Sequence, residues 1–527
     1  MIVLGLHKDP WHNSGATIIR DDGDGPQFAY ISEERMDRVK DSRSFPECST
    51  RACMEELGIE GIEEIDLIVL DYILNGDDWR QDYHQAKSRT DVFLADVPAS
   101  KVRTVNHHLC HAFSTFYSSS FEDAAVLVID GRGSDHETQS LFHGTKDGLE
   151  LVETTDAIGI GLLYAAVTNV IGFGLLQEGK TMGLAPYGDG VGSQIFDFKG
   201  EFDGIRTDYS AVCAEGKNEF KVPFKAISND EEQARAAFEV QEECERAMLH
   251  LAEYAKARTG SDYLCISGGV GLNSVSNYKC LQANIFKDVF INPAASDTGI
   301  PLGAALYGYH QLCGQPKTYD TISPFLGPSY SEDRIETAIK AADGFEWIRN
   351  GIDHASEMLA KNQIVGCFQG RSEMGPRALG NRSILMSPID PKNKDTLNSR
   401  VKHREAFRPF APAILEERVA EYFEIDRPSP YMLFVPTVVP DKRDIIPAVT
   451  HVDGTARVQT VTKERNPHFR RLVESFEAQT GVPVLLNTSF NDNGEPIVET
   501  PEDAIRCFLK TDIDALLIGD HLLIKAA

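Results

Sequence analysis

The sequence predicts an α/β protein in which one strand-turn-strand arrangement occurs twice before the character of the chain changes. Residues 1–20 read as an apolar strand, MIVLGL, a polar turn and a second strand, ATIIR. Residues 124–144, AAVLVIDGRGSDHETQSLFHG, repeat this order around a turn of glycine and aspartate. Mixed strand and helix patterns follow both units, which predicts a duplicated α/β architecture with a cleft between its halves.

Further elements follow in order along the chain. Residues 231–259 predict a long helix that ends at Gly260, because glycine commonly terminates helices. A short strand, YLCIS, a glycine loop and another helix come next, and residues 316–330 are rich in Pro, Ser and Thr, as linkers or crossing loops often are. Beyond residue 350 an arginine-rich stretch lies among the strands IVGCFQG, VPVLLNTSF and ALLIGDHLLIK, so we expect a domain boundary near residue 348.

The composition excludes several classes of protein. The 527 residues exceed what one hydrophobic core organises, and 42% hydrophobic with 25% charged residues is ordinary for a soluble globular protein. The start, MIVLGLHKDP, predicts no signal peptide, and no run reaches the roughly 18 apolar residues that span a membrane. Ten cysteines without a CxxC pair predict free thiols in a cytoplasmic protein and argue against a zinc finger. The net charge of -28 argues against nucleic-acid binding over the whole surface but leaves a local basic cleft open.

Two histidines and two aspartates form a candidate metal site. His107 and His111 lie four residues apart in NHHLCHAFSTF, a spacing that places both on one face of a helix. Asp130 follows the apolar strand VLVI at a glycine turn, and Asp297 lies in a similar turn, NPAASDTG. Imidazoles with carboxylates and no thiolate favour iron, manganese or zinc. A pair of histidines at this spacing is by itself more often structural, and we expect His108, on another face, to be a hydrogen-bonding residue.

A glycine loop and a lysine are candidates for binding a nucleotide. Gly268 and Gly269 lie in SGGVGLN after an apolar strand, where backbone N–H groups can approach phosphate oxygens at the start of a helix. The loop matches neither a Rossmann nor a Walker pattern. Lys180 lies in GKTMGLAPYG, whose flexible backbone positions suit a polyphosphate. An ordinary strand-to-helix turn and a solvated loop lysine explain the same residues, and the sequence alone leaves both interpretations open.

The stretch from Arg371 to Arg408 reverses the charge of the chain. It holds nine Lys or Arg against four Asp or Glu, within a protein of net charge -28. Such a local reversal indicates an anionic partner, and arginine suits phosphate because its planar fork binds two oxygens together. Residues 486–491, LNTSFN, add a polar cluster after a strand that reads as buried.

In their order along the chain, these motifs resemble the carbamoyltransferase family of nodulation and antibiotic biosynthesis. The resemblance covers almost the whole chain and rests on WHNSGAT, SEERMDRVKDSRSFP, NHHLCHAFSTFYSSSF, VIDGRGSD, QEGKTMGLAPYG, ISGGVGLN, NPAASDTG, GRSEMGPRALGNRSIL, VKHREAFRPFAP, ARVQTV and LNTSFN. It implies a Kae1-like domain over residues 1–347, with the two-lobed actin/Hsp70-like ATPase fold. It also implies a YrdC-like α/β domain over residues 348–527.

The resemblance further implies an ATP-dependent O-carbamoyltransferase. In such enzymes the C-terminal domain cleaves carbamoyl phosphate to phosphate and carbamate, which passes inside the protein to the N-terminal site. There carbamate attacks the α-phosphate of ATP to give carbamoyladenylate and pyrophosphate, and an acceptor hydroxyl takes the carbamoyl group. We therefore expect Fe2+ or a similar divalent ion as cofactor, and ATP with Mg2+ and carbamoyl phosphate as substrates. Holding the intermediate away from water is a physical reason for two sites joined internally.

Motif by motif, the resemblance implies roles for individual residues. The candidate metal ligands correspond to iron ligands that contact nucleotide phosphate. The implied nucleotide contacts are Lys180, Gly183, Gly268, Gly269 and Asn273. The implied carbamoyl-phosphate pocket consists of Arg377, Lys402, Arg408, Arg457, Asn487 and Thr488. His12, in the turn PWHNSG, matches the histidine implicated in transfer, where a neutral imidazole can take a hydroxyl proton near pH 7. The alternative for His12 is a turn histidine that only hydrogen bonds to the neighbouring backbone.

The acceptor is left open, because residues from about 72 to 100 match no motif of the family. A natural-product sugar, an aminoglycoside or a similar small molecule is the first expectation. Carbamoylation of a hydroxymethylated nucleobase in DNA is an alternative that the acidic charge disfavours. We expect no membrane partner, and a homodimer remains open.

Three rival classes of protein share part of these features. A threonylcarbamoyl-type tRNA modifier shares the N-terminal fold, but GPRALGNRS and KHREAFRPF belong to the carbamoyl-phosphate branch. A hydrogenase-maturation carbamoyltransferase would carry CxxC pairs, which this chain lacks. A nucleotide sensor without catalytic activity would need no metal set together with an arginine pocket.

Overall fold

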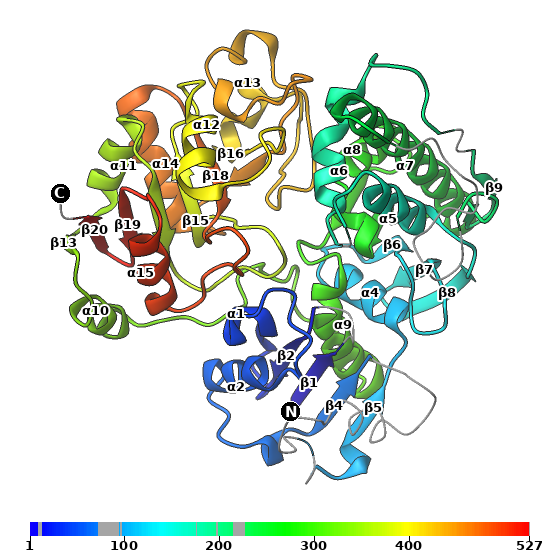
Figure 1. The fold of residues 1–527 in the computed structure, drawn as a ribbon. Coiled ribbons are helices and arrows are strands. Elements are labelled where there is room, and N and C mark those ends of the chain that lie inside the picture. The colour runs from blue at the N-terminus through cyan, green and yellow to red at the C-terminus, as the bar shows by residue number, and fades with distance from the viewer. Residues whose placement is uncertain are drawn as a thin grey trace. The chain divides into compact units, whose positions relative to one another are not determined.

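The computed structural model describes residues 1–8, 13–71, 94, 97–174, 176–196, 199–213 and 227–525 (Figure 1). The chain forms two compact units, unit 1 with residues 1–33 and 42–322, and unit 2 with residues 34–41 and 323–527. The division falls inside the predicted linker of residues 316–330, whereas the boundary expected near residue 348 falls within strand β13 (Phe345–Arg349). This strand pairs with the last strand of the chain, β20 (His521–Lys525), so residues before 348 complete the C-terminal sheet.

Unit 1 contains two five-stranded sheets with the same topology. In each, three consecutive strands pair antiparallel, and two later strands continue the sheet in parallel beyond the first of the three. The first sheet has the order β3-β2-β1-β4-β5, formed by Gln27–Ser32, Gly15–Arg20, Ile2–His7, Leu67–Leu70 and Val102–Thr104. The second has the order β8-β7-β6-β11-β12, formed by Gly148–Thr155, Gln139–Thr145, Asp123–Ile129, Tyr263–Ser267 and Asp288–Ile291. The predicted duplicated α/β architecture is therefore confirmed.

Close packing of a helix on the first sheet depends on glycine. Helix α9 (Ile300–Leu306) packs against β1 and against helix α4 (His107–Phe116). A Cβ atom on Gly5 would lie 2.2 Å from the oxygen of Pro301, and one on Gly303 would lie 1.9 Å from the oxygen of Cys110. Only glycine permits these approaches, which bring the start of α4 beside the ends of the central strands.

The predicted long helix is also confirmed. Helix α7 spans Asp230–Thr259, begins at the capping side chain of Asn229 and ends at Gly260 in the left-handed conformation (φ 69°). The remaining secondary-structure elements of unit 1 are α2 (Glu47–Glu56), α5 (Ile160–Val170), α6 (Glu178–Leu184), α8 (Ser274–Gln282), the short strands β9 (Glu201–Asp203) and β10 (Arg206–Asp208), and several single-turn helices.

Unit 2 is built on one mixed sheet of eight strands in the order β13-β20-β19-β14-β15-β18-β16-β17. Between β20 and β17 the strands are Ala515–Ile518, Val365–Phe368, Arg382–Met386, Val484–Ser489 and Ala411–Leu415, and β17 is Gln459–Val461. Its helices are α10 (Glu332–Lys340), α11 (Ile352–Ala360), α12 (Asn393–Leu397), α13 (Val419–Tyr422), α14 (Pro467–Thr480) and α15 (Pro501–Lys510). The C-terminal part is thus an α/β domain, as predicted.

Two further expectations concern the whole chain. All ten cysteines are free thiols, and eight of them are buried. Within the described residues, no helix combines the length and the apolar character that a bilayer crossing requires.

Candidate functional site

Helix α4 carries the two histidines predicted to bind a metal. The helix starts at His107 because the Asn106 side chain accepts a hydrogen bond from Leu109 N at 3.0 Å. His107 and His111 lie on one face, as their spacing predicts, with ring centroids 4.8 Å apart and both side chains buried. His108 is instead hydrogen bonded through Nδ1 to a serine hydroxyl of β7 at 2.7 Å, as expected.

The structure brings both histidines together with the two predicted aspartates. Asp130 directly follows the central strand β6, and Asp297 begins the single-turn helix η5 (Asp297–Gly299). Asp130 Oδ2 lies 3.4 Å from Nε2 of His107 and 3.5 Å from Nε2 of His111. Asp297 Oδ1 lies 3.5 Å from each of the same two nitrogen atoms. Residues from three separate elements therefore form one buried cluster, which we call the metal cluster.

The geometry of the metal cluster fits a divalent ion better than a set of hydrogen bonds. Nε2 of each histidine is buried and makes no hydrogen bond within the described part of the chain. Two ligand atoms about 2.1 Å from one ion lie about 3.4 Å apart in a tetrahedral arrangement, close to the separations observed here. Two carboxylates also supply negative charge that a bound cation would neutralise. The donor set of nitrogen and oxygen atoms thus fits the predicted metal, and the identity of that metal remains a prediction.

Electrostatics in the metal cluster also favour a cation. Burial lowers the pKa of His107, but the carboxylates of Asp130, Asp297 and Asp71 outweigh it and raise that pKa well above its ordinary value. Burial and the charge of Asp297 raise the pKa of Asp130, but the imidazoles of His107 and His111 lower it overall. Protons and a metal ion therefore compete for the same ligand atoms, and metal binding at this cluster should release protons.

Two residues beside the metal cluster were missed by sequence reasoning. Asp71 follows strand β4, and one of its oxygens lies 3.1 Å from Nδ1 of His107. Both Asp71 oxygens lie 2.9 Å from Nδ1 of His7, at the end of β1. These are hydrogen-bond distances, so Asp71 orients the ring that turns Nε2 toward the cluster, as outer carboxylates do at many metal sites. The signal was present, because LIVLD repeats the strand-plus-aspartate pattern of VLVID.

The glycine loop supports the metal cluster from the end of strand β11. Ser267 Oγ lies 3.3 Å from Nδ1 of His111. Gly268 has φ 88°, and a Cβ there would lie 2.3 Å from a backbone oxygen of β6, so the position requires glycine. Gly269 N donates to Asp130 Oδ1 at 2.8 Å. The predicted phosphate-binding N–H group at Gly269 is thus engaged by a proposed metal ligand.

The other predicted nucleotide contacts lie on helices. Asn273 caps α8 by accepting from Ser276 N at 3.0 Å, and its Nδ2 donates to Gln241 Oε1 at 2.9 Å. Lys180 and Gly183 lie in α6, so the expectation of a flexible segment at residues 179–188 was wrong: α6 and the single-turn helix η3 (Ala185–Gly188) occupy it. Their roles toward a nucleotide remain predictions. His12 lies outside the described residues.

Unit 2 gathers four arginines, which we call the arginine cluster: Arg377, Arg404, Arg408 and Arg457. Arg377 lies in the loop between β14 and β15, Arg404 and Arg408 follow α12, and Arg457 precedes β17. Nε of Arg377, Arg404 and Arg457 is buried without a hydrogen-bond partner among the described residues. One carboxylate lies beside the cluster: an oxygen of Glu405 is 3.8 Å from Nη1 of Arg408.

The arginine cluster is electrostatically unfavourable without an anion. Burial and the charge of Arg408 lower the pKa of Arg377 to about 10. Burial and neighbouring guanidinium groups lower the pKa of Arg404 to about 9 and that of Arg457 well below its ordinary value. Buried like charges with free donors fit an anionic ligand with several oxygens. Arg404 was not among the predicted pocket residues, although its place in KHREAFRPF between Lys402 and Arg408 was a usable signal.

Three other predicted pocket residues have different surroundings. Lys402 Nζ donates to Asn491 Oδ1 at 2.7 Å and to the backbone oxygens of Ser489 and Asn491 at 2.9 Å and 3.1 Å. Its donors therefore support the end of β18. Asn487, on β18, keeps a buried Oδ1 atom without a hydrogen-bond partner among the described residues, and Thr488 follows it at a partly exposed position.

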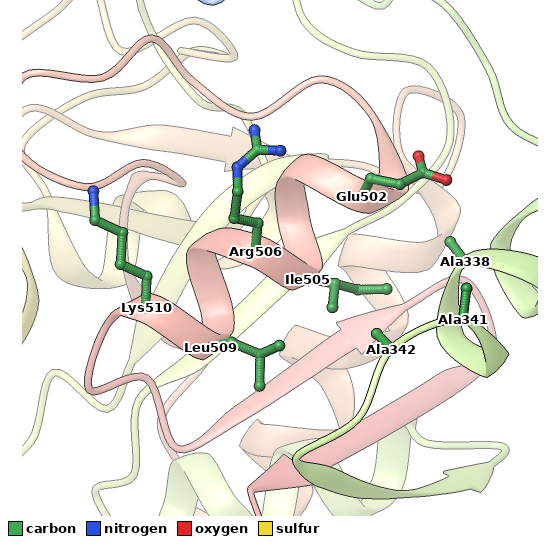
Figure 2. A pocket seen from close by; sticks show the side chains of 8 residues that line it. All are labelled: Ala338, Ala341, Ala342, Glu502, Ile505, Arg506, Leu509 and Lys510. Carbon is green, nitrogen blue, oxygen red and sulfur yellow. The ribbon is translucent and has the colours of Figure 1, made fainter.

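Unit 2 also has a hollow between α10 and α15 (Figure 2). This open hollow has a volume of about 510 Å³ and is lined by Ala338, Ala341, Ala342, Glu502, Ile505, Arg506, Leu509 and Lys510. Figure 2 shows Ile505 of α15 on the side of the helix that faces the alanines. No predicted site residue lines this hollow, so it lies apart from the proposed chemistry.

Comparison with known proteins yields two matching family models. The model described as the carbamoyltransferase N-terminus matches residues 73–306, and the one described as the carbamoyltransferase C-terminus matches residues 356–525. The first range contains all four residues of the metal cluster, and the second contains the arginine cluster.

Curated relatives extend over most of the chain. Nodulation protein NolNO of Sinorhizobium fredii is 37% identical over 99% of this chain and 80% of its own length. Nodulation protein NolO of Bradyrhizobium diazoefficiens is 38% identical over 80% of this chain and 79% of its own length. A 3'-hydroxymethylcephem-O-carbamoyltransferase of Amycolatopsis lactamdurans is 35% identical over 66% of this chain and 64% of its own length.

Proposed function

Because the chain belongs to the carbamoyltransferase family, we propose that it transfers the carbamoyl group of carbamoyl phosphate to an acceptor hydroxyl in an ATP-dependent reaction. Unit 2 would bind and cleave carbamoyl phosphate, and unit 1 would bind ATP and a divalent metal. The proposal assigns one buried charged cluster to each unit.

The observation that carries this proposal is the arginine cluster. Carbamoyl phosphate is an anion with several phosphoryl oxygens, and planar guanidinium groups bind such oxygens in pairs. The buried Nε atoms of Arg377, Arg404 and Arg457 would gain partners. The mutual repulsion that lowers the arginine pKa values would be offset by the bound charge.

The chemistry proposed for unit 2 is hydrolysis. Carbamoyl phosphate and water give carbamate and phosphate, and the guanidinium groups stabilise charge on the phosphoryl oxygens as the bond breaks. Arg408 keeps a partly exposed side chain. It is therefore well suited to receive an entering anion.

The chemistry proposed for unit 1 is adenylation followed by transfer. A carbamate oxygen attacks the α-phosphorus of ATP and pyrophosphate leaves, and the acceptor oxygen then attacks the carbamoyl carbon and AMP leaves. His107, His111, Asp130 and Asp297 would hold the metal, which when bound supplies positive charge for phosphate oxygens. His12, proposed as the base that takes the acceptor proton, would contribute a factor of about 10²–10⁴.

A hydroxyl acceptor is supported by the name of one relative, the 3'-hydroxymethylcephem-O-carbamoyltransferase. We propose a small molecule with a free hydroxyl group, such as a natural-product sugar, as the acceptor class. Incubation with candidate hydroxyl compounds, carbamoyl phosphate and ATP should produce a mass increase of one carbamoyl group. Wild-type protein that adds no carbamoyl group to any hydroxyl but modifies an amine would contradict O-transfer.

The two halves of the proposal can be tested separately. Arg408→Ala should lower the release of phosphate from carbamoyl phosphate by about tenfold or more, because it removes charge-assisted hydrogen bonds. ATP binding should stay unchanged in the same variant. The matched control is Arg465→Ala, since Arg465 pairs with Glu416 at 3.0 Å on the surface of the same unit. An Arg408→Ala protein that binds ATP poorly and still cleaves carbamoyl phosphate would reverse the assignment.

A further inference from the structure

The segment Glu34–Asp41 belongs to unit 2 although the residues on both sides of it belong to unit 1. It begins inside helix α1 (Glu33–Asp37), directly after strand β3 of the first sheet. The chain therefore leaves unit 1 for eight residues and returns, and we call this stretch the inserted segment.

The two residues that flank the inserted segment, Glu33 and Ser42, are both hydrogen bonded to one residue of unit 1. Glu33 N donates to Ser14 O at 2.9 Å, and Ser14 N donates to Ser42 O at 3.1 Å. The buried Glu33 carboxylate also accepts from Cys48 N at 3.1 Å and Ser49 N at 2.7 Å, at the start of α2. In the sequence, Ser14 lies two residues after His12, the residue proposed to act in transfer.

The far end of the inserted segment is anchored in unit 2 by Arg38. Its Nη1 donates to Ile497 O at 2.7 Å, and its Nη2 donates to Pro496 O at 2.9 Å. Arg38 has φ 61°, a conformation that costs a non-glycine residue free energy and persists where surrounding contacts determine it. Glu34 Oε2 accepts from Asp41 N at 2.9 Å and closes the segment on itself.

Arg35 extends from the inserted segment to the loop that carries Arg377. The side chain is buried, and its Nη2 donates to Gly375 O at 3.4 Å, two residues before Arg377. Its Nη1 lies 3.8 Å from Glu499, whose other oxygen lies 3.5 Å from Arg382 at the end of the same loop. Arg35 thus contacts the middle of this loop directly and the C-terminal end of the loop through a shared carboxylate.

The rest of the loop is shaped by side chains of unit 2. Glu373 Oε1 accepts from the backbone N atoms of Leu379, Asn381 and Arg382 at 2.7, 2.8 and 3.1 Å. Amide groups of Gln459 and Asn487 donate to loop carbonyl oxygens at 2.8 Å and 3.2 Å. A loop held by so many specific contacts has a defined shape, and Arg35 adds a contact from 340 residues away in the sequence.

We propose that Arg35 is a positioning residue for the anion site of unit 2, and that the inserted segment couples occupancy of this site to unit 1. The inference rests on the proposed function insofar as the arginine cluster binds a phosphoryl anion. An anion bound to Arg377 would stabilise the loop that Arg35 contacts. From Arg35 the chain leads through Glu34 to Glu33, whose backbone N donates a hydrogen bond to Ser14 O. Coupling of this kind is reciprocal, so a nucleotide in unit 1 should in turn tighten anion binding in unit 2.

The first test measures the affinity for inorganic phosphate by calorimetry. Arg35→Lys keeps the charge beside Glu499 but loses the planar fork, and the double variant Arg35→Met/Glu499→Gln removes both buried charges. Each should bind phosphate about tenfold more weakly than wild type, at a temperature where it is folded. Arg51→Ala is the matched control, since Arg51 pairs with Glu47 on the exposed surface of α2, and it should bind phosphate as wild type does.

Arg408→Ala separates failure of this inference from failure of the proposed function. If Arg408→Ala leaves phosphate binding intact, the arginine cluster is not the anion site and the proposed function fails. If Arg408→Ala weakens phosphate binding but a folded Arg35→Lys protein binds it as wild type does, the role of Arg35 is overturned. If the double variant does not fold, phosphate binding by the Arg35→Lys protein alone decides whether Arg35 has this role.

The second test measures coupling between the units. ATP affinity is determined with and without saturating phosphate in wild type and in Arg38→Ala, which loses the anchor to Ile497 and Pro496. Wild type should bind ATP about 5-fold or more tightly with phosphate present, and Arg38→Ala should lose this difference while still binding both ligands. Equal coupling in both proteins, or no coupling in wild type, would overturn the proposed transmission.

Discussion

The metal cluster of unit 1 and the arginine cluster of unit 2 are both buried, yet they differ in the hydrogen-bond partners that surrounding residues provide. Residues outside the metal cluster contact its members: Asp71 contacts His107, Ser267 contacts His111, and Gly269 N donates to Asp130. In the arginine cluster the members repel one another, and buried guanidinium nitrogens remain without partners among the described residues. From this comparison we expect that the first site is organised before a ligand binds, and that an anionic ligand would stabilise the second.

We expect the largest effect from substitutions within the metal cluster itself. His107→Ala/His111→Ala removes two of the four proposed ligands. Metal affinity should therefore fall by more than about 100-fold, the upper limit expected when only an outer contact is lost. Metal content after dialysis, measured by elemental analysis, checks this. His143→Ala is the control, because His143 pairs with Asp123 at 3.0 Å away from the cluster. Equal metal content in the double variant and wild type would remove the site.

A smaller effect sharpens the claim that the metal cluster is preorganised. Asp71→Asn leaves all four proposed ligands in place but weakens the charged hydrogen bond to Nδ1 of His107, so metal affinity should fall about 10–100-fold. A competition titration with a metal chelator measures the change. Asp123→Asn breaks the surface pair with His143 and should leave the affinity unchanged. If both variants behave alike, Asp71 does not orient the ligand.

In the arginine cluster, by contrast, removing one member should stabilise the protein as long as no anion is bound. Arg457→Met removes a buried charge whose Nε has no hydrogen-bond partner among the described residues, so without phosphate the free energy of unfolding should rise by about 1 kcal/mol or more. With phosphate at 100 times its dissociation constant, wild type should gain about 2.7 kcal/mol and the variant much less. Urea unfolding with and without phosphate measures both values. A variant that is less stable than wild type under both conditions would show that Arg457 has its partners already.

A further expected effect is a pH dependence of stability at the edge of the arginine cluster. Burial and the charges of Arg404 and Arg408 lower the pKa of Lys402 to about 7. The unfolded lysine has a pKa of about 10.4, so between about pH 7 and 10 the unfolded state binds more protons and stability rises with pH. Lys402→Met should remove up to about 1.4 kcal/mol per pH unit from this slope. Unfolding curves across this range check it, and a slope unchanged by the substitution would contradict the lowered pKa.

Sequence patterns predicted the elements that local chemistry defines. Helix α7 extends from the asparagine cap to Gly260 within one residue of expectation, and β11 spans the predicted YLCIS. The HxxxH spacing placed His107 and His111 on one helical face because the helical repeat alone determines that relation. The domain boundary was harder, because β13 pairs with β20 from the far end of the chain and no local signal records such a partner.

The candidate site shows the same limit. The sequence suggested Asp130 and Asp297 as ligands, but it did not reveal Asp71 or His7, whose relation to His107 arises where separate parallel strands end side by side. It treated the Lys180 segment as flexible, although tertiary packing makes it helical. It counted nine basic residues between Arg371 and Arg408 without separating those with structural partners, such as Arg400 on Asp514, from those in the cluster.

By itself the sequence determined the α/β class, the duplicated strand order, the long helix and the family to which the chain belongs. These follow from periodicity, caps and motifs, which act over a few residues. Only the tertiary structure decided which charges have partners of opposite charge. It also decided that Gly269 N donates a hydrogen bond to Asp130 and that residues 34–41 belong to the C-terminal unit. The physical reason is that hydrogen bonds and charge repulsion depend on distances between residues far apart in the chain, which are set only when the strands and helices pack together.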